Sequence, residues 1–305
     1  MTQPAAIRTD RLTKFYGRGG RRRRGIVEVD LEIAEGEVFG FLGPNGAGKT
    51  TTIRLLLGLL RPTSGRAEIL GFDAHADSVE VHRRVGYLSA DPALFERLTG
   101  RELLEWLGRL RGSIERRVVD GLADRLDLDL SQTIRSLSRG NRQKVAVIQA
   151  FMHSPDVLLL DEPTSGLDPL VQHTFHEMVA EVVAEGRSVF LSSHVLDEVG
   201  HLCDRVGIIR EGRLVAMEDV EDLRARAVRD VRIRFRERVD PAPFRSIPGV
   251  SQVHAEGRTV SLRASGDLDA LVKLAASHHV LDFVSSPAEL EEVFLSYYRQ
   301  PEASS

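Results

Sequence analysis

The sequence predicts an α/β fold in which a central, mostly parallel sheet is followed by a smaller α+β domain. Three observations support this prediction. Continuous apolar runs such as Val38–Leu42 and Val157–Leu160 alternate with stretches of helical periodicity, as expected for buried central strands. A glycine-rich turn, Gly43–Thr51, joins one such run to a leucine-rich helical stretch. Near residue 228 the pattern changes, and none of these signals returns after that point.

The composition is that of an ordinary globular protein without a strong charge bias. Of 305 residues, 42% are hydrophobic and 28% are charged, and the formal net charge is −4. This balance gives no global attraction to nucleic acid or anionic lipid. The apolar run Ile53–Leu60 is interrupted by a charge and a glycine and falls short of the ~20 residues that span a bilayer. No transmembrane segment is therefore expected.

Two features bear on the cellular compartment. Met1–Ala6 lacks the basic start and apolar core of a signal peptide, so a cytoplasmic location is expected. Cys203 is the single cysteine of the chain, which rules out an intrachain disulfide and predicts a small buried side chain.

The first strands are predicted on either side of residue 36. Val27, Val29, Leu31 and Ile33 alternate with acidic residues, which is typical of a strand with one buried face. Val38–Leu42 is apolar throughout and predicts a strand covered on both faces, from which the chain enters the glycine-rich turn.

That turn fits the pattern G-x-x-x-x-G-K-[ST] of a phosphate-cradling P-loop. Glycines let the backbone curl so that its N–H groups point inward, and the following helix adds the positive end of its dipole. A polyphosphate is therefore the predicted ligand. Lys49 is placed to reach the outer phosphates, and the Thr50 hydroxyl offers a hard oxygen to Mg²⁺.

A basic stretch, Arg18 with Arg21–Arg24, precedes the P-loop in what the pattern predicts to be the loop of a first hairpin. It is either a solvated turn or a local basic patch near the bound nucleotide or a lipid headgroup. Four adjacent arginines do not decide between these interpretations.

From residue 60 to residue 153 the sequence predicts a short sheet, a crossover and a helical region. Val85–Leu88 is typical of a buried strand. From Thr99 to about Leu130 the pattern is helical, with leucines at helical spacing between Leu103 and Leu110, and Trp106 is expected to contribute packing rather than function. Leu137–Lys144 is a polar stretch with Ser and Gly that opens another helix, which indicates a second anion-binding helix start.

Two carboxylates, Asp161 and Glu162, follow the strand Val157–Leu160, at the edge where a doubly wound sheet places its site. An aspartate there can hold Mg²⁺ through water, and the glutamate can orient or deprotonate an attacking water. A solvated strand end explains such a pair equally well. His194 follows the next apolar strand, Ser188–Leu191, and is ambiguous by itself.

Residues 228–305 are predicted to form a ferredoxin-like domain with the order strand, helix, strand, strand, helix, strand and a last helix. Val231, Ile233 and Phe235 alternate in the first of these strands, and Gly257 turns the central hairpin.

Taken together, residues 7–225 resemble the ATP-binding subunit of an ABC transporter, most closely the drug and multidrug exporter type that works with a separate membrane permease. The resemblance rests on six motifs in a fixed order: Tyr16, Gly43–Thr51, Leu137–Asn141, Asp161–Glu162, Ser165–Asp168 and His194. It implies a P-loop NTPase domain over residues 1–227, with a helical subdomain at about 91–153, and an accessory domain over residues 228–305.

The resemblance also implies a role for each motif. Tyr16 would stack on adenine, Glu162 would polarise the attacking water, and His194 would contact the γ-phosphate. Mg²⁺ would be held by Thr50 and Asp161. ATP would be bound by the P-loop residues Gly43, Pro44, Asn45, Gly46, Ala47, Gly48, Lys49, Thr50 and Thr51 of one chain, and by the signature residues Ser138 and Gly140 of a second; Asn141 and Asp168 complete the predicted nucleotide-binding set.

The implied partners are a second copy of the chain, in a homodimer, and an integral membrane permease, with no nucleic acid. The subunit would lie in the cytoplasm against the inner face of the cell membrane, where ATP hydrolysis drives export of a drug-like or lipid-like substrate. The rival interpretations are an ABC-type ATPase that acts on nucleic acid or the ribosome, and a P-loop kinase of a small molecule.

The sequence departs from the family pattern at two places. Where the family usually has a Gln after the strand Val85–Leu88, this chain has Ser89-Ala90-Asp91, so Ala90 stands at the Gln position and an altered rate or coupling is expected. In the signature, Arg139 and Asn141 replace the commoner Gly and Gln, from which little loss of function is expected.

Overall fold

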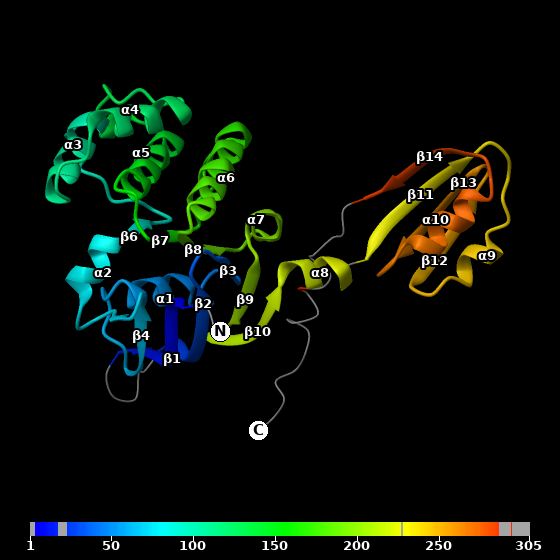
Figure 1. Ribbon diagram of the computed structural model, residues 1–305, viewed down its shortest axis with the longest axis horizontal. Helices are drawn as coiled ribbons and strands as arrows, with labels where there is room; N and C mark the ends of the chain where they lie inside the picture. Colours follow the sequence, from blue (N-terminus) through cyan, green and yellow to red (C-terminus); the bar gives the residue numbers. More distant parts are fainter. Residues whose placement is uncertain (1–3, 18–22, 227, 287–293, 295–305) are drawn as a thin grey trace. The chain divides into compact units, whose positions relative to one another are not determined.

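The computed structural model describes residues 4–17, 23–226, 228–286 and 294 (Figure 1). The chain divides into two compact units, Met1–Met217 and Glu218–Ser305, each with its own hydrophobic core. The domain boundary at residue 228 and the helical subdomain at about 91–153 stay predictions.

A six-stranded sheet with the order β10-β9-β3-β8-β7-β6 forms the centre of the first unit. Its strands are β3 (Val38–Leu42), β6 (Val85–Leu88), β7 (Val157–Asp161), β8 (Ser188–Ser193), β9 (Arg205–Arg210) and β10 (Arg213–Asp219). All pairs from β9 to β6 are parallel. Every residue of β3, β7 and β8 is buried, which confirms the strands predicted from the apolar runs. The loops that leave these three strands therefore meet at one edge of the sheet.

A smaller antiparallel sheet has the order β2-β1-β4-β5. It comprises β1 (Ala5–Tyr16), β2 (Arg23–Ala34), β4 (Ser64–Ile69) and β5 (Phe72–Asp73). The odd-numbered apolar residues from Val27 to Ile33 are buried in β2, as predicted from their alternation. β2 begins earlier than predicted, because Arg23 and Arg24 pair with the end of β1 and so belong to the strand rather than to the hairpin loop.

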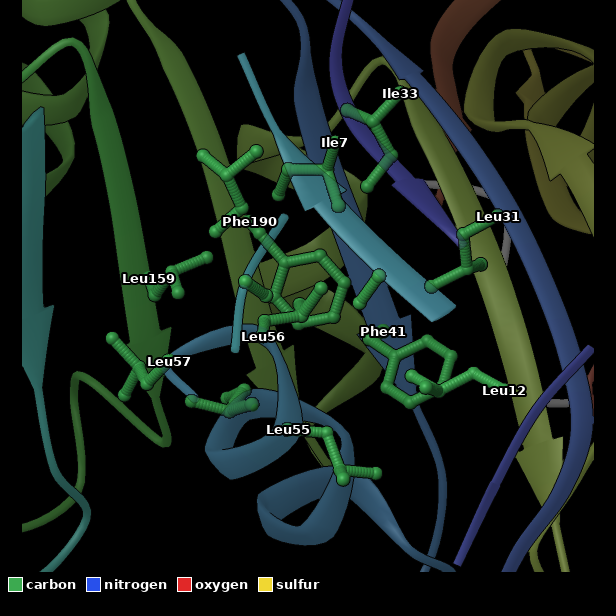
Figure 2. Packing of buried hydrophobic residues seen from close by; sticks show 14 of the residues in the cluster. Ile7, Leu12, Leu31, Ile33, Phe41, Leu55, Leu56, Leu57, Leu159 and Phe190 are labelled. Carbon is green, nitrogen blue, oxygen red and sulfur yellow. The ribbon is translucent and has the colours of Figure 1, made fainter. Parts of the chain in front are cut away.

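The core of the first unit lies where these two sheets and the helix α1 (Lys49–Leu56) meet. Figure 2 shows side chains from β1, β2, β3, α1, β7 and β8 packed together. At its centre the Phe190 ring lies 5.9 Å from that of Phe39 and 5.4 Å from that of Phe41, measured between ring centroids. Because α1 contributes Ile53, Leu55 and Leu56 to this core, the start of the helix is held firmly beside the sheet edge.

The other helices up to residue 226 are α2 (Ser78–Arg84), α3 (Gly100–Leu110), α4 (Arg116–Arg125), α5 (Arg139–Phe151), α6 (Pro169–Ala184), α7 (Leu196–Leu202) and α8 (Val220–Arg226), with a 3₁₀ turn at Ile134–Ser136. None of the described helices is long and apolar enough to cross a membrane. Cys203, which follows α7, is buried as predicted.

The helical region predicted from residue 99 to residue 130 is confirmed and contains two helices, α3 and α4. Gly112 and Ser113 have φ angles of 97° and 75°, which a right-handed helix cannot continue through, so α3 ends before them. The packing expected of Trp106 is only partial: its ring lies edge-on against Phe95, with centroids 5.4 Å apart, yet 43% of the residue is exposed.

The second unit is an antiparallel sheet with the order β12-β13-β11-β14. Its elements are β11 (Arg229–Phe235), α9 (Ala242–Arg245), β12 (Val250–Glu256), β13 (Thr259–Ala264), α10 (Asp269–Ala276) and β14 (Val280–Ser285). This order of strands and helices confirms the ferredoxin-like prediction, with Val231, Ile233 and Phe235 in the core. The predicted last helix falls, apart from Phe294, outside the described residues.

The half-buried ring of His153, between α5 and β7, makes the stability of the first unit depend on pH. Burial, and to a smaller extent the charge of Arg111, lower the pKa of His153 from 6.5 to about 4. The unfolded chain therefore binds the proton first as the pH falls, so stability is lost progressively below pH 6.5. We expect a loss of about 1 kcal/mol between pH 7 and pH 5, after allowance for solvent screening. Denaturant titrations at both pH values check this, and in His153→Gln the difference should shrink.

Candidate functional site

The P-loop forms the bend between β3 and α1, at the edge of the parallel sheet. Gly46 and Gly48 have φ angles of 81° and 116°, a region that side chains other than glycine rarely adopt. A Cβ at Gly48 would also lie 2.6 Å from Cγ2 of Ile26, so a larger residue there would force the loop away from β2. The bend thus needs glycine at these positions, and its backbone is left open to a ligand.

The side chain of Lys49 is buried inside this bend, with 6% exposed. Its Nζ donates a hydrogen bond of 2.5 Å to the Gly43 carbonyl oxygen at the start of the loop. The same Nζ lies 3.1 Å from Oε1 of Glu162, at the end of β7. The Lys49 ammonium group therefore lies between the P-loop and the Glu162 carboxylate. From this position it can form charge-assisted hydrogen bonds to a polyphosphate bound in the loop.

Asp161 is the last residue of β7 and is 1% exposed. It accepts a hydrogen bond of 2.8 Å from Thr50 Oγ1 and one of 2.5 Å from Ser192 Oγ. The carboxylate and the Thr50 hydroxyl are hard oxygen ligands side by side. This donor set suits Mg²⁺, which takes one or two protein oxygens and fills its other positions with water and phosphate.

Glu162 lies between Lys49 and His194. Its Oε2 is 2.7 Å from Nδ1 of His194, and its backbone N–H donates to the Ser192 carbonyl. Its φ angle is 49°, a left-handed conformation that is costly for a glutamate and tends to be kept where function requires it. Glu162, predicted to polarise the attacking water, and His194, predicted to contact the γ-phosphate, are thus hydrogen-bonded to each other.

A cavity of about 490 Å³ is bordered by Lys49, Thr50 and Glu162, whereas Asp161 and His194 are not among its lining residues. Its lining residues are Tyr16, Arg23, Arg24, Gly25, Pro44, Asn45, Gly46, Gly48, Lys49, Thr50, Thr51, Ala90 and Glu162. Tyr16 enters from β1, and its hydroxyl lies 3.1 Å from Oγ1 of Thr51. An exposed aromatic ring at the mouth of a phosphate-binding cavity is suitably placed to stack on a nucleotide base.

Two arginines of the basic stretch, Arg23 and Arg24, line the cavity as well, which favours the patch near the bound ligand over a merely solvated turn. Arg24 forms an ion pair of 2.8 Å with Glu211. Gly25 holds this segment close to the ring, since a Cβ there would lie 2.8 Å from Cε2 of Tyr16. The other arginines of the stretch, Arg18, Arg21 and Arg22, lie outside the described residues.

The signature residues are elsewhere on the same chain. Ser138 caps α5, where its hydroxyl accepts a hydrogen bond of 3.2 Å from the Asn141 N–H. Gly140 lies against the next loop, because a Cβ there would be 2.8 Å from the Gly166 carbonyl oxygen. Asp168 caps α6. The P-loop cavity is lined by none of the predicted residues Ser138, Gly140, Asn141 and Asp168.

Sequence reasoning missed several residues of the site. Gly25 carries no sequence signal of its own. Ser192 and Ser193 carry a signal, because two hydroxyl groups end an apolar strand directly before His194. Such a polar strand end at the edge of the sheet indicates a contribution to the site. Ser192 proves to hold Asp161, whereas the sequence linked only Thr50 to that carboxylate.

Comparison with known proteins points to one family. A family model described as ABC transporter matches residues 26–165. The daunorubicin/doxorubicin resistance ATP-binding protein DrrA of Streptomyces peucetius is 33% identical, over 98% of this chain and 94% of its own length. The bacitracin transport ATP-binding protein BcrA of Bacillus licheniformis is 36% identical, over 72% of each chain.

Solved structures agree with these relatives. The structure of an ATP-binding subunit of an ABC transporter superposes with a TM-score of 0.65 at 30% identity, over 72% of this chain and 92% of that one. A dimeric ATP-binding cassette in a post-hydrolysis state, bound to ADP and Pi, has a TM-score of 0.65 at 23% identity, over 70% of this chain and 98% of that one, and shares the fold.

Proposed function

The chain belongs to the ABC transporter family as its ATP-binding, ATP-hydrolysing subunit, and from this premise we propose that two copies close on two ATP molecules to drive export through a separate membrane permease. The observation that carries the proposal is the chain of contacts from Lys49 through Glu162 to His194, beside the Thr50–Asp161 pair.

Each of these side chains has a distinct task in the proposed reaction. Lys49 and the loop amides bind the β- and γ-phosphates. Thr50 and Asp161 would hold Mg²⁺, whose charge would offset the negative charge that develops during phosphoryl transfer. Glu162 orients the attacking water and accepts its proton. His194 keeps that carboxylate directed toward the γ-phosphate through the 2.7 Å contact. Tyr16 stacks on the adenine ring.

The proposed homodimer is supported by the position of the signature residues, which lie outside the P-loop cavity. Ser138, Gly140 and Asn141 stand at the N-terminus of α5, where the helix dipole favours an anion. They do not border the P-loop cavity of their own chain, so in the proposal they meet the γ-phosphate held by a second copy. A chain with one P-loop and one signature completes both sites by twofold symmetry.

Ala90, at the usual Gln position, does line the cavity. Its methyl group can neither bind Mg²⁺ nor donate a hydrogen bond to water. We therefore propose that ATP binding is intact in this subunit, while the rate of hydrolysis and its coupling to the permease differ from those of relatives with Gln.

An exposed apolar groove is the surface that we assign to the permease. Phe95 and Trp106 are 58% and 43% exposed and line a hollow of about 540 Å³ together with acidic and basic side chains. Only four residues separate Phe95 from Ala90 in the nucleotide cavity. A partner seated on this groove is thus linked directly to the site of hydrolysis.

We expect Trp106→Glu to abolish recovery of the permease with the subunit, because a charge replaces the largest apolar side chain of the groove. ATP affinity should not change. Val79→Glu, at a 67% exposed position on α2, is the matched control and should leave recovery intact. Co-purification from membranes, quantified against the unmodified subunit, checks the expectation; equal recovery with Trp106→Glu would contradict this assignment.

Export is supported by the relatives, whose names refer to daunorubicin and doxorubicin resistance and to bacitracin transport. Two experiments test the partner and the direction of transport. The Glu162→Gln subunit is purified with its membrane complex and the bound protein is identified, and transport is assayed in inverted vesicles that contain the unmodified subunit. An integral membrane protein in stoichiometric amount and ATP-dependent uptake into inverted vesicles are expected. Stoichiometric nucleic acid in place of a membrane protein would favour the rival ribosome or nucleic-acid function.

A further inference from the structure

Glu198, on α7, is a buried carboxyl that the reaction described above does not use. It is 6% exposed. Its Oε2 accepts a hydrogen bond of 2.6 Å from Ser193 Oγ. Its other oxygen, Oε1, is buried without a hydrogen-bond partner among the described residues. Such an orphaned acceptor costs free energy, so its retention calls for an explanation.

The hydroxyl that Glu198 holds is part of the turn that presents His194. Ser193 Oγ accepts a hydrogen bond of 2.9 Å from the Val195 N–H. This bond joins the residue before His194 to the residue after it. Ser193 is fully buried. Glu198 therefore fixes His194 indirectly, through the residue before it, and His194 in turn contacts Glu162.

Glu198 also stands close to the loop that follows Glu162. Burial raises the pKa of its carboxyl most, while the hydroxyls of Ser193 and then Thr164 lower it. Thr164 belongs to the tight turn after β7, in which the Ser165 N–H donates to the Glu162 carbonyl and the Leu167 N–H to the Thr164 carbonyl. Thr164 is therefore the residue of this turn whose hydroxyl lies near the Glu198 carboxyl.

The helix that carries Glu198, α7, is packed tightly against the sheet. At Gly40 in the middle of β3, a Cβ would lie 2.8 Å from Val199 Cγ1 and 2.9 Å from Cys203 Sγ, so α7 is seated directly on the sheet. A carboxyl on a helix that is fixed in this way can hold neighbouring loops in place.

We propose that Glu198 is a positioning residue that fastens the two loops on either side of Glu162, through Ser193 to the His194 turn and through Thr164 to the loop that ends at Asp168. The inference rests on the proposed roles of Glu162 and His194. In this arrangement the Thr164 hydroxyl serves Oε1, so that both loops share one anchor. Since Glu198 does not line the nucleotide cavity, it governs the rate of hydrolysis and not ATP affinity.

The test compares kcat and the Kd for ATP of the full-length chain and its Glu198→Ala, Glu198→Gln, Thr164→Val and Ser193→Ala variants. We expect Glu198→Ala to lower kcat about tenfold with Kd unchanged, because misplacing the water-orienting group slows chemistry without weakening binding. Glu198→Gln keeps an acceptor for Ser193 and should recover part of the rate. Glu177→Gln, at an exposed position on α6, is the control and should match the unmodified chain.

A double-mutant cycle separates positioning from general destabilisation. Once Glu198→Ala is present, Thr164→Val should lower kcat no further, whereas the effects of Glu198→Ala and Glu177→Gln should multiply. If Glu198→Ala does not fold, the cycle of Glu198→Gln with Thr164→Val gives the same comparison. A kcat within twofold of the unmodified chain in Glu198→Ala, or independent effects of the two sites, would overturn the inference. Full turnover in Glu162→Gln would instead contradict the proposed function, so the two failures are distinguishable.

Discussion

Glu162→Gln should reduce ATP turnover by about 100- to 1,000-fold while ATP still binds. The amide can neither accept a proton from water nor supply the negative charge that Lys49 and His194 contact. Gln has the same shape, so the cavity is preserved. With hydrolysis blocked, two copies should remain closed on ATP. The measurement is steady-state phosphate release, together with the molar mass in solution with and without Mg²⁺ and ATP.

The control for this variant is Glu185→Gln, at an exposed position just after α6. It should behave as the unmodified chain in both assays. If Glu162→Gln hydrolyses ATP at the unmodified rate, or remains monomeric with saturating ATP, Glu162 does not have the role proposed here.

Lys49→Ala should weaken ATP binding by about 100-fold, since it removes the buried cation that faces the P-loop and Glu162 and leaves that carboxylate to repel the phosphates. Titration calorimetry with Mg²⁺ and ATP measures the effect. The loss should be larger for ATP than for AMP, because the side chain reaches the outer phosphates.

Lys273→Ala removes an exposed lysine from α10 in the second unit and serves as the matched loss of charge. It should leave the Kd for ATP unchanged. An unaltered Kd in Lys49→Ala would mean that the loop Gly43–Thr51 is not the nucleotide site.

The fold was largely predictable from the sequence, because local patterns carried it. Val38–Leu42 and Val157–Leu160 are apolar throughout, and each proves to be a fully buried strand. The helical region predicted up to residue 130 is confirmed, but its division into α3 and α4 was not predicted, because the break depends on positive φ angles at Gly112 and Ser113, which the leucine periodicity does not report.

The site was predictable only as a set of motifs, and their roles remain proposals. Spacing along the chain does not reveal that Ser192 holds Asp161 or that Glu198 holds Ser193, since these contacts join the ends of separate elements. Nor does it show that Arg23 lines the cavity, because that depends on how far β2 extends into the basic stretch.

The central claim is that each ATP site combines the P-loop of one copy with the signature of the other, and subunit mixing tests it directly. Lys49→Ala inactivates the P-loop. Ser138→Asp keeps a helix-capping side chain on α5 but adds a negative charge against the γ-phosphate, and Ser138→Asn is its neutral control. Each of the two inactivated subunits should be inert alone. Mixed in equal amounts, they should recover up to about a quarter of the unmodified ATPase rate, because half of the dimers then hold one intact site. A mixture that stays as inactive as its components would contradict the shared site.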